Sequence, residues 1–188
     1  MSGRLLNLPN ILTIARIAAI PLVVVCYVLP VAWGRPAAAL LFLASSATDW
    51  LDGYLARRWN QTSAFGRFLD PVADKLAVAA ALVLLVQGHP HSYVAVPAII
   101  IVGREITVSA LREWMAEIGQ RARVAVSMIG KSKTALQMAA ITLMLWDYPV
   151  LGLPLYEIGV VLFYLAAALT LWSMALYLQA AWPSLRKS

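Results

Sequence analysis

DWLDGYLARRWNQTSAFGRFLDPVAD, residues 49–74, places four aspartates in the middle of a chain that is otherwise strongly apolar. The acids stand at positions 49, 52, 70 and 74, and long apolar runs flank them on both sides. An ionised carboxylate is costly to hold in an apolar environment, so acids within such a sequence are rare and commonly functional. The stretch therefore predicts a working site.

The composition around this stretch is that of an integral membrane protein. Of 188 residues, 62% are hydrophobic and 13% are charged, whereas soluble domains are about half apolar and about a quarter charged. We therefore expect one integral membrane domain over residues 1–188, with no separate soluble domain. The single cysteine, Cys26, excludes an intrachain disulfide.

Apolar windows near the ~20 residues that cross a bilayer recur along the chain. They predict helices at about 11–30, 37–58, 69–87, 92–114, 132–147 and 155–180. Prolines and glycines in the intervening segments mark the turns. The predicted fold is all-α, a polytopic membrane protein with six transmembrane helices.

Basic residues are distributed unequally between the two sets of connections. Segments 1–10, 57–68, 112–133 and 183–188 hold eleven lysines and arginines, whereas the opposite turns hold only Arg35. By the positive-inside rule, both termini face the cytoplasm, and the aspartates lie at the cytoplasmic ends of the second and third helices. His89 and His91 fall in an outer turn, where we expect them to be solvated.

The spacing of the four aspartates brings their carboxylates together. Asp49 and Asp52 are three residues apart, and Asp70 and Asp74 four apart, so each pair shares one helix face. A short connection makes the two helices antiparallel neighbours. Carboxylates this close need protons or cations, and oxygen ligands without Cys or His favour Mg²⁺ or Mn²⁺. We expect a pair of such ions, an arrangement typical of phosphoryl transfer.

Small residues surround the acids. Gly53, Ala56 and Gly66 each remove side-chain bulk within about a turn of a carboxylate. They leave room for a nucleotide or a pyrophosphate to approach the backbone. Close helix packing is the alternative explanation, since membrane bundles favour small residues at helix contacts.

A second cluster of the sequence is basic. Arg104 and Arg112 are eight residues apart on one face of the fourth helix, and Lys131 and Lys133 enter the fifth from the same side. We expect these four to hold a phosphate, arginine through its planar fork and lysine as a point charge. The alternatives are topogenic or lipid-binding charge for the lysines, and an ion pair with Glu105 or an aspartate for Arg104.

The acidic stretch resembles the signature of the CDP-alcohol phosphotransferase family. The agreement covers eight defined residues over 26 positions: Asp49, Asp52, Gly53, Ala56, Arg57, Gly66, Asp70 and Asp74. Members are six-helix membrane enzymes, commonly homodimers, that use divalent metals to displace CMP from a CDP-linked lipid or alcohol. The resemblance implies the same fold and chemistry here.

The resemblance also implies a role for individual residues. Asp49, Asp52 and Asp70 would hold the first metal ion, and Asp49, Asp70 and Asp74 the second. Asp74 would also act as the general base. The residues expected to contact CDP-diacylglycerol are Asn10, Thr13, Gly53, Ala56, Arg57, Ser63 and Gly66. For Asn10 and Thr13, an N-cap of the first helix is the alternative.

Runs 7–16, 103–106, 110–115 and 129–134 resemble the bacterial family members whose acceptor is sn-glycerol 3-phosphate. They imply transfer of phosphatidyl from CDP-diacylglycerol to that acceptor at the cytoplasmic face of the inner membrane, with release of CMP. This is the committed step toward phosphatidylglycerol and cardiolipin. No nucleic acid is expected as a partner.

Three alternatives remain open at this point. A related synthase that uses inositol phosphate needs the same basic cradle, whereas one that uses serine does not. A cation transporter is more remote, because the outer halves of the second and third helices, at 37–44 and 77–85, carry no polar path.

Overall fold

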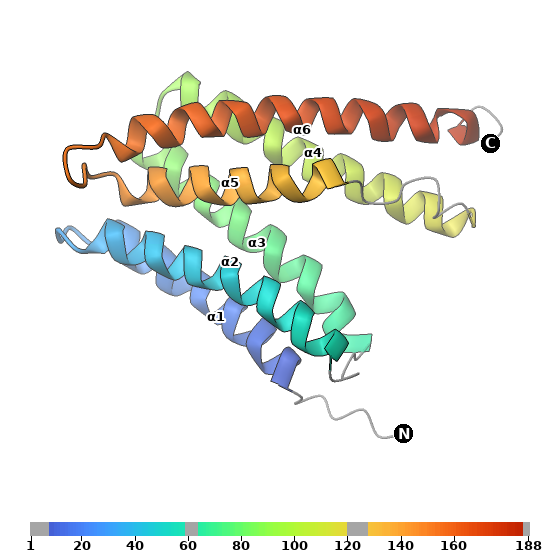
Figure 1. Cartoon of the computed structure of the whole chain (residues 1–188), viewed down its shortest axis with the longest axis horizontal. Helices are drawn as coiled ribbons and strands as arrows, with labels where there is room; N and C mark the ends of the chain where they lie inside the picture. Colours follow the sequence, from blue (N-terminus) through green and yellow to red (C-terminus); the bar gives the residue numbers. More distant parts are fainter. Residues whose placement is uncertain (1–7, 59–63, 120–127, 186–188) are drawn as a thin grey trace.

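The computed structural model describes residues 8–58, 64–119 and 128–185, and these ranges form six helices. In chain order they are α1 (Leu8–Val28), α2 (Gly34–Arg58), α3 (Ala64–Gly88), α4 (Ser92–Glu117), α5 (Met128–Trp146) and α6 (Leu155–Leu185) (Figure 1). Within the described ranges there is no β-strand, only an isolated bridge between Val150 and Leu153. The prediction of an all-helical chain with six helices is confirmed.

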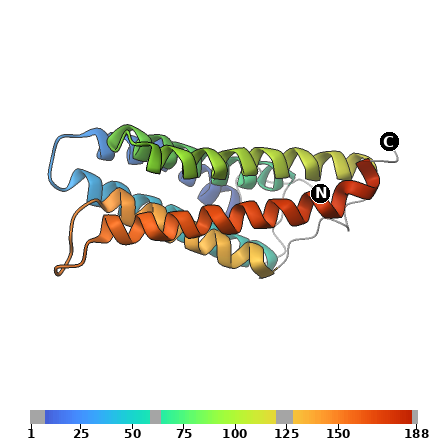
Figure 2. The same cartoon turned by 90° about the horizontal axis from the view of Figure 1, so that it is seen from above.

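The helices run back and forth along one long axis (Figures 1 and 2). One end of the bundle, here called the short-loop end, carries the connections 29–33, 89–91 and 147–154. The opposite end carries the beginnings of α1, α3 and α5 and the ends of α2, α4 and α6. Odd-numbered helices therefore run parallel to one another, and so do even-numbered ones.

The third helix begins earlier than its apolar window predicts. It starts at Ala64, whereas the apolar window predicts a start near residue 69, so Gly66 and Pro71 both lie inside α3. The apolar window misses these turns because residues 64–68 are only partly apolar, yet the chain remains helical there. Proline has no N–H, so the carbonyl of residue 67 loses its helical partner.

The hydrophobic core is concentrated toward the short-loop end. The main cluster draws on all six helices and includes Tyr27, Phe42, Leu82, Ile101 and Phe163. Toward the opposite end, the second cluster joins only α4 and α6 and consists of Val108, Leu111, Met115, Tyr177 and Ala181. The group α1–α3 and the group α4–α6 accordingly diverge toward that end (Figure 1).

Three of the described helical segments are long and apolar enough to cross a membrane: Asn10–Val28, Ser92–Glu117 and Leu155–Trp182. Large apolar side chains are exposed on their outside, among them Leu22, Ile99 and Trp172. A contiguous apolar exterior of this kind is stable against lipid and unstable against water. These features indicate a membrane protein.

A polar cluster fastens the three connections at the short-loop end. Arg35, at the start of α2, forms an ion pair with Asp147, which follows α5. His89 Nε2 lies 3.1 Å from Asp147 Oδ1, and the His89 ring stacks on Tyr156 with centroids 4.2 Å apart. The Arg35 guanidinium also covers the Tyr27 ring at 5.3 Å. The expectation that His89 is solvated is therefore wrong, whereas His91 is exposed.

Candidate active site

The four aspartates lie on α2 and α3 at the end opposite the short loops. Asp49 and Asp52 belong to the last turns of α2, and Asp70 and Asp74 to the second and third turns of α3. The described part of the structure does not include the side chains of Asp49, Asp52, Ala56 and Arg57 or the surroundings of Gly53. Ser63 lies outside the described residues altogether. The backbone therefore places all four acids at one end, and side-chain geometry is described for Asp70 and Asp74 only.

The first helix contributes directly to the acidic region. The Thr13 hydroxyl donates a hydrogen bond to Asp70 Oδ1 over 2.6 Å. Thr13 and Asn10 are both buried, each 1% exposed, although they belong to the most apolar part of the chain. Both lie inside α1, which begins at Leu8, so the N-cap alternative is wrong.

Arg16 is a residue of this region that the sequence reasoning did not assign. It lies one turn beyond Thr13 on α1 and is only 4% exposed. Because α1 and α3 run parallel, one turn on from the Thr13–Asp70 contact brings Arg16 and Asp74 to the same level of the bundle. The signal was present in the sequence, since a charge inside an apolar helix is commonly functional.

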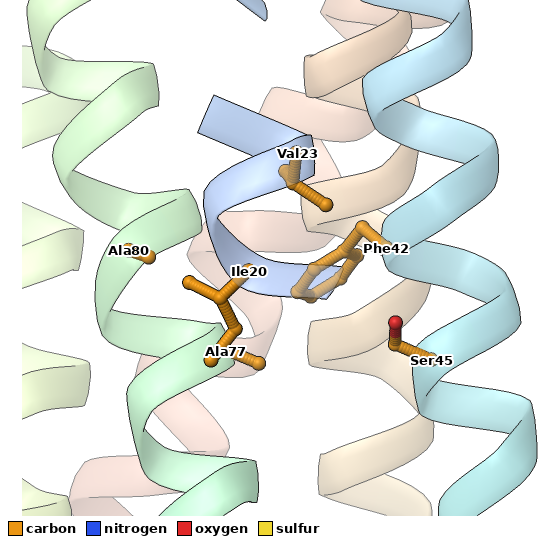
Figure 3. A pocket seen from close by; sticks show the side chains of 6 residues that line it. All are labelled: Ile20, Val23, Phe42, Ser45, Ala77 and Ala80. Atoms are coloured by element: carbon orange, nitrogen blue, oxygen red, sulfur yellow. The ribbon is translucent and has the colours of Figure 1, made fainter. Parts of the chain in front are cut away.

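An apolar cavity lies between α1, α2 and α3, directly next to the acidic region (Figure 3). Its lining consists of Ile20, Val23, Phe42, Ser45, Ala77 and Ala80. Ser45 stands one turn before Asp49 on α2, and Ala77 one turn after Asp74 on α3. The interface of the three helices thus changes from apolar to acidic within a single turn.

The basic cluster is assembled from three helices. Arg104 of α4 is 9% exposed and Lys133 of α5 is 1% exposed. Both face Glu105: Arg104 forms an ion pair with Glu105 Oε1, and Lys133 Nζ lies 3.6 Å from the same oxygen. From α6, the Ser173 hydroxyl accepts a hydrogen bond from Arg104 Nη2 over 3.4 Å. The Glu105 pair is the alternative that the sequence left open for Arg104, and it is present.

Arg112 joins this cluster from two turns further along α4. Its Nη2 donates to the Tyr177 hydroxyl of α6 over 2.9 Å, and its guanidinium lies 5.2 Å from the centroid of that ring. Arg104, Glu105 and Arg112 are all close enough to act electrostatically on the Lys133 ammonium. The structure therefore brings three of the four predicted phosphate ligands together. The side chain of Lys131 lies outside the described residues.

One contact fixes the level of the acidic region relative to the basic cluster. Ser46 of α2 lies 3.5 Å from Met138 Sδ of α5. The two helices are antiparallel. Position 49 on α2 and Lys133 on α5 therefore both lie roughly one turn from this contact, toward the end opposite the short loops. Both clusters therefore occupy the same end of the bundle, at a similar depth.

Sequence reasoning missed the side chains that hold the cations. Ser173 and Tyr177 are four residues apart on α6, but nothing distinguishes them within an apolar helix until the contacts with Arg104 and Arg112 are known. Gln137, 4% exposed and one turn from Lys133, is a further buried polar residue of α5. The one-turn spacing of Gln137 from Lys133 is visible in the sequence, whereas its burial is not.

Comparison with known proteins decides the family. The family model described as CDP-alcohol phosphatidyltransferase matches residues 6–172. The chain belongs to the CDP-alcohol phosphatidyltransferase family. It is 51% identical over 175 residues to proteins of Shigella flexneri serotype 5b, Shigella boydii serotype 4 and Escherichia coli K12. These alignments cover 93% of this chain and 94% of each relative, and each relative bears the name CDP-diacylglycerol–glycerol-3-phosphate 3-phosphatidyltransferase.

The family uses divalent metal ions generally, and the described acids suit such ions. Asp70 and Asp74 are half-buried carboxylates one turn apart, and hard cations prefer such oxygen ligands. The hydrogen bond from Thr13 occupies one position on Asp70 Oδ1, and Asp70 Oδ2 remains a further possible ligand. With only these two of the four acids described, no group of three metal-ligating side chains occurs in the described part of the chain.

Proposed function

We propose that this chain transfers the phosphatidyl group of CDP-diacylglycerol to sn-glycerol 3-phosphate, giving phosphatidylglycerophosphate and CMP. Family membership supports transfer from a CDP-linked donor, and the names of the relatives support this pair of substrates. The basic cluster supports an acceptor that carries a phosphate.

The single observation that carries this assignment is the burial of the Lys133 ammonium. This ammonium is almost fully buried, and among the described residues its one ion-pair partner is Glu105, whose Oε1 lies 3.6 Å from Nζ. A buried cation with uncommitted N–H donors is costly in a resting protein, unless a ligand completes it. An acceptor phosphate supplies charge and acceptor atoms together, and Arg104 and Arg112 stand ready to share it.

The donor side of the reaction belongs to the acidic region. Two divalent ions held by Asp49, Asp52, Asp70 and Asp74 would neutralise the pyrophosphate of the donor when bound. Asn10, Thr13, Gly53, Ala56, Arg57, Ser63 and Gly66 form the proposed contacts to CDP-diacylglycerol. The hydrogen bond from Thr13 to Asp70 favours this role for Thr13, because it fixes one carboxylate beside the first helix.

Asp74 acts as the general base in this proposal. It accepts the proton of the acceptor's primary hydroxyl, whose oxygen then attacks the phosphorus that bears diacylglycerol. Asp74 lies one turn further along α3 than Asp70, at the level of Arg16 on the parallel helix α1. Base assistance of this kind adds about 10²–10⁴-fold to such reactions.

The proposed topology is that of six transmembrane helices in one domain over 1–188, with both termini and the active site at the cytoplasmic face of the bacterial inner membrane. The unequal distribution of lysine and arginine supports this orientation. In this proposed orientation the acidic and basic clusters would both lie on the cytoplasmic side, where the water-soluble acceptor is found. A homodimer is proposed from the family resemblance alone.

The experiment that tests the acceptor assignment separates the two substrates by their KM values. Removing a hydrogen bond to a charged group costs about 1.5–3 kcal/mol, or one to two decades in affinity. Lys133→Gln and Arg112→Gln should therefore raise the KM for glycerol 3-phosphate about tenfold or more. The KM for CDP-diacylglycerol should change less than about twofold, because the donor belongs to the acidic region.

The matched control is Glu113→Gln, which neutralises an exposed charge beside Arg112 on the same helix and should leave both constants unchanged. A rise confined to the CDP-diacylglycerol KM would contradict the assignment of the basic cluster to the acceptor. The related synthase acting on inositol phosphate remains the second candidate, because the same cluster would suit that acceptor. Comparison of the two acceptors distinguishes them directly.

A further inference from the structure

We propose that Glu105 is a positioning residue of the acceptor site, which holds the Arg104 and Lys133 cations in register for the acceptor phosphate. This inference rests on the proposed function, since it gives a role to a residue beside the proposed acceptor ligands. Glu105 itself would not touch the phosphate.

A single carboxylate oxygen joins the two cations. Glu105 Oε1 forms the ion pair with Arg104 and also lies 3.6 Å from Lys133 Nζ. The two cations come from different helices, Arg104 from α4 and Lys133 from α5. Glu105 therefore links the spacing of α4 and α5 at this level to the spacing of the two phosphate ligands.

Burial shows why a linking anion is needed. Arg104 and Lys133 are 9% and 1% exposed, so their like charges repel in a region that water screens poorly. The Glu105 side chain is 30% exposed, so it is the least buried of these three side chains. With the carboxylate present, the two cations stay close together; without it, repulsion drives them apart.

The two cations are held with different strength, which separates their roles. Arg104 is fixed on both sides, through Nη1 by Glu105 and through Nη2 by Ser173 of α6. Among the described residues, Lys133 has only the longer ion pair with Glu105, so further N–H donors of its ammonium remain for a ligand. Glu105 thus orients Arg104 firmly. It places the Lys133 ammonium beside Arg104 while leaving N–H donors of that ammonium for a ligand.

The test is Glu105→Gln, which keeps the size and the hydrogen-bonding oxygen but removes the charge. We expect the KM for glycerol 3-phosphate and the Ki of inorganic phosphate as a competitive inhibitor to rise together, each about tenfold. The kcat and the KM for CDP-diacylglycerol should stay within about twofold of the wild type. A loss of general folding would instead lower kcat and affect both substrates. Glu113→Gln is the matched control on the same helix.

A second variant guards against misfolding of the first. Glu105→Asp keeps the charge but shortens the side chain by one methylene, and we expect a smaller rise in the same two constants. If Glu105→Gln leaves both constants unchanged while Lys133→Gln raises them, the positioning role is overturned and the proposed function stands. A fall in the two constants would show that Glu105 competes with phosphate and would also overturn the role. If neither Glu105→Gln nor Lys133→Gln changes the KM for glycerol 3-phosphate or the Ki of phosphate, the acceptor site itself is misplaced.

Discussion

The Thr13 hydroxyl on α1 and the Asp70 carboxylate on α3 are joined by a hydrogen bond of 2.6 Å across 57 residues of sequence. A short bond from a hydroxyl to a carboxylate is typical of a charge-assisted contact. It makes α1 part of the acidic region and fixes the orientation of one proposed metal ligand. Residues that orient a metal ligand in this way commonly influence metal affinity and activity.

Thr13→Val should reduce activity by weakening metal binding. Valine keeps the shape of threonine but cannot donate to Asp70, and loss of such an outer partner typically costs about 10–100-fold in metal affinity or activity. The measurement is CMP release as a function of Mg²⁺ concentration. Thr13→Ser retains the hydroxyl and should behave nearly as the wild type does. An unchanged Mg²⁺ dependence in Thr13→Val would contradict a role of this bond in the site.

Removal of the metal, or of the acids proposed to bridge two ions, should abolish turnover. EDTA should inhibit the purified protein, and Mg²⁺ or Mn²⁺ should restore it. Asp49→Ala and Asp70→Ala should remain inactive at millimolar Mg²⁺, since each would remove a ligand from both ions. Full turnover in either variant under those conditions would rule out the bridging assignment.

Two glycines should respond oppositely to alanine. A Cβ at Gly159 of α6 would lie 2.7 Å from Met144 Cγ and 3.0 Å from its backbone N, on the facing helix α5. Gly159→Ala should destabilise the bundle by about 1–3 kcal/mol, because backbone cannot move aside as a side chain does. Each kcal/mol lowers Tm by about 2–4 °C in a chain of this size. Thermal unfolding in detergent measures the effect.

Gly103→Ala is the matched control for Gly159→Ala. At Gly103 of α4, a Cβ would meet nothing within 4 Å. Alanine is the better helix former by up to about 1 kcal/mol, so this variant should keep the wild-type Tm or exceed it slightly. Equal destabilisation by the two substitutions would contradict the close packing of α5 against α6.

The short-loop end should lose stability as the pH falls. Burial, with smaller contributions from the Arg35 and His91 charges, lowers the pKa of His89 below its usual value near 6.5. Asp147 beside it is already paired with Arg35, so little attraction is left for a second cation. Below about pH 6.5, His89 is protonated in the unfolded chain but still neutral in the folded chain. The stability present above that pH is therefore lost as the pH falls through the lowered pKa of the folded state.

His89→Gln measures this contribution. The fall in Tm between pH 7.5 and pH 5.5 should be smaller in the variant than in the wild type, because glutamine does not titrate. Other groups titrate equally in both proteins, so the difference belongs to position 89. Identical pH profiles would contradict a lowered pKa of His89.

Hydropathy and spacing predict the six helices because each is a local property of the sequence. The predicted windows find every described helix, and family membership bears out the acidic signature. The start of α3 at Ala64 escapes the windows because helical structure there extends beyond the apolar run. The convergence of Arg104, Arg112 and Lys133 was predicted from their common side of the bundle.

Partners supplied by distant segments could not be predicted. Ser173 and Tyr177 contact Arg104 and Arg112 only because α6 packs on α4, and that packing depends on the whole bundle. His89 and Asp147 come from two separate connections and Arg35 from the start of α2, and no local pattern relates the three residues. Glu105 was visible as a neighbour of Arg104, but its approach to Lys133 depends on how α5 returns beside α4.

Acceptor-dependent release of CMP distinguishes transfer to sn-glycerol 3-phosphate from the alternative reactions. Purified protein is given CDP-diacylglycerol and Mg²⁺ with one acceptor at a time: sn-glycerol 3-phosphate, inositol phosphate, serine or plain glycerol. We expect rapid release with sn-glycerol 3-phosphate and very slow release with glycerol, which has the hydroxyls but no phosphate for Arg104 and Lys133. Release with glycerol or serine comparable to that with sn-glycerol 3-phosphate would contradict this expectation, and so would preference for inositol phosphate.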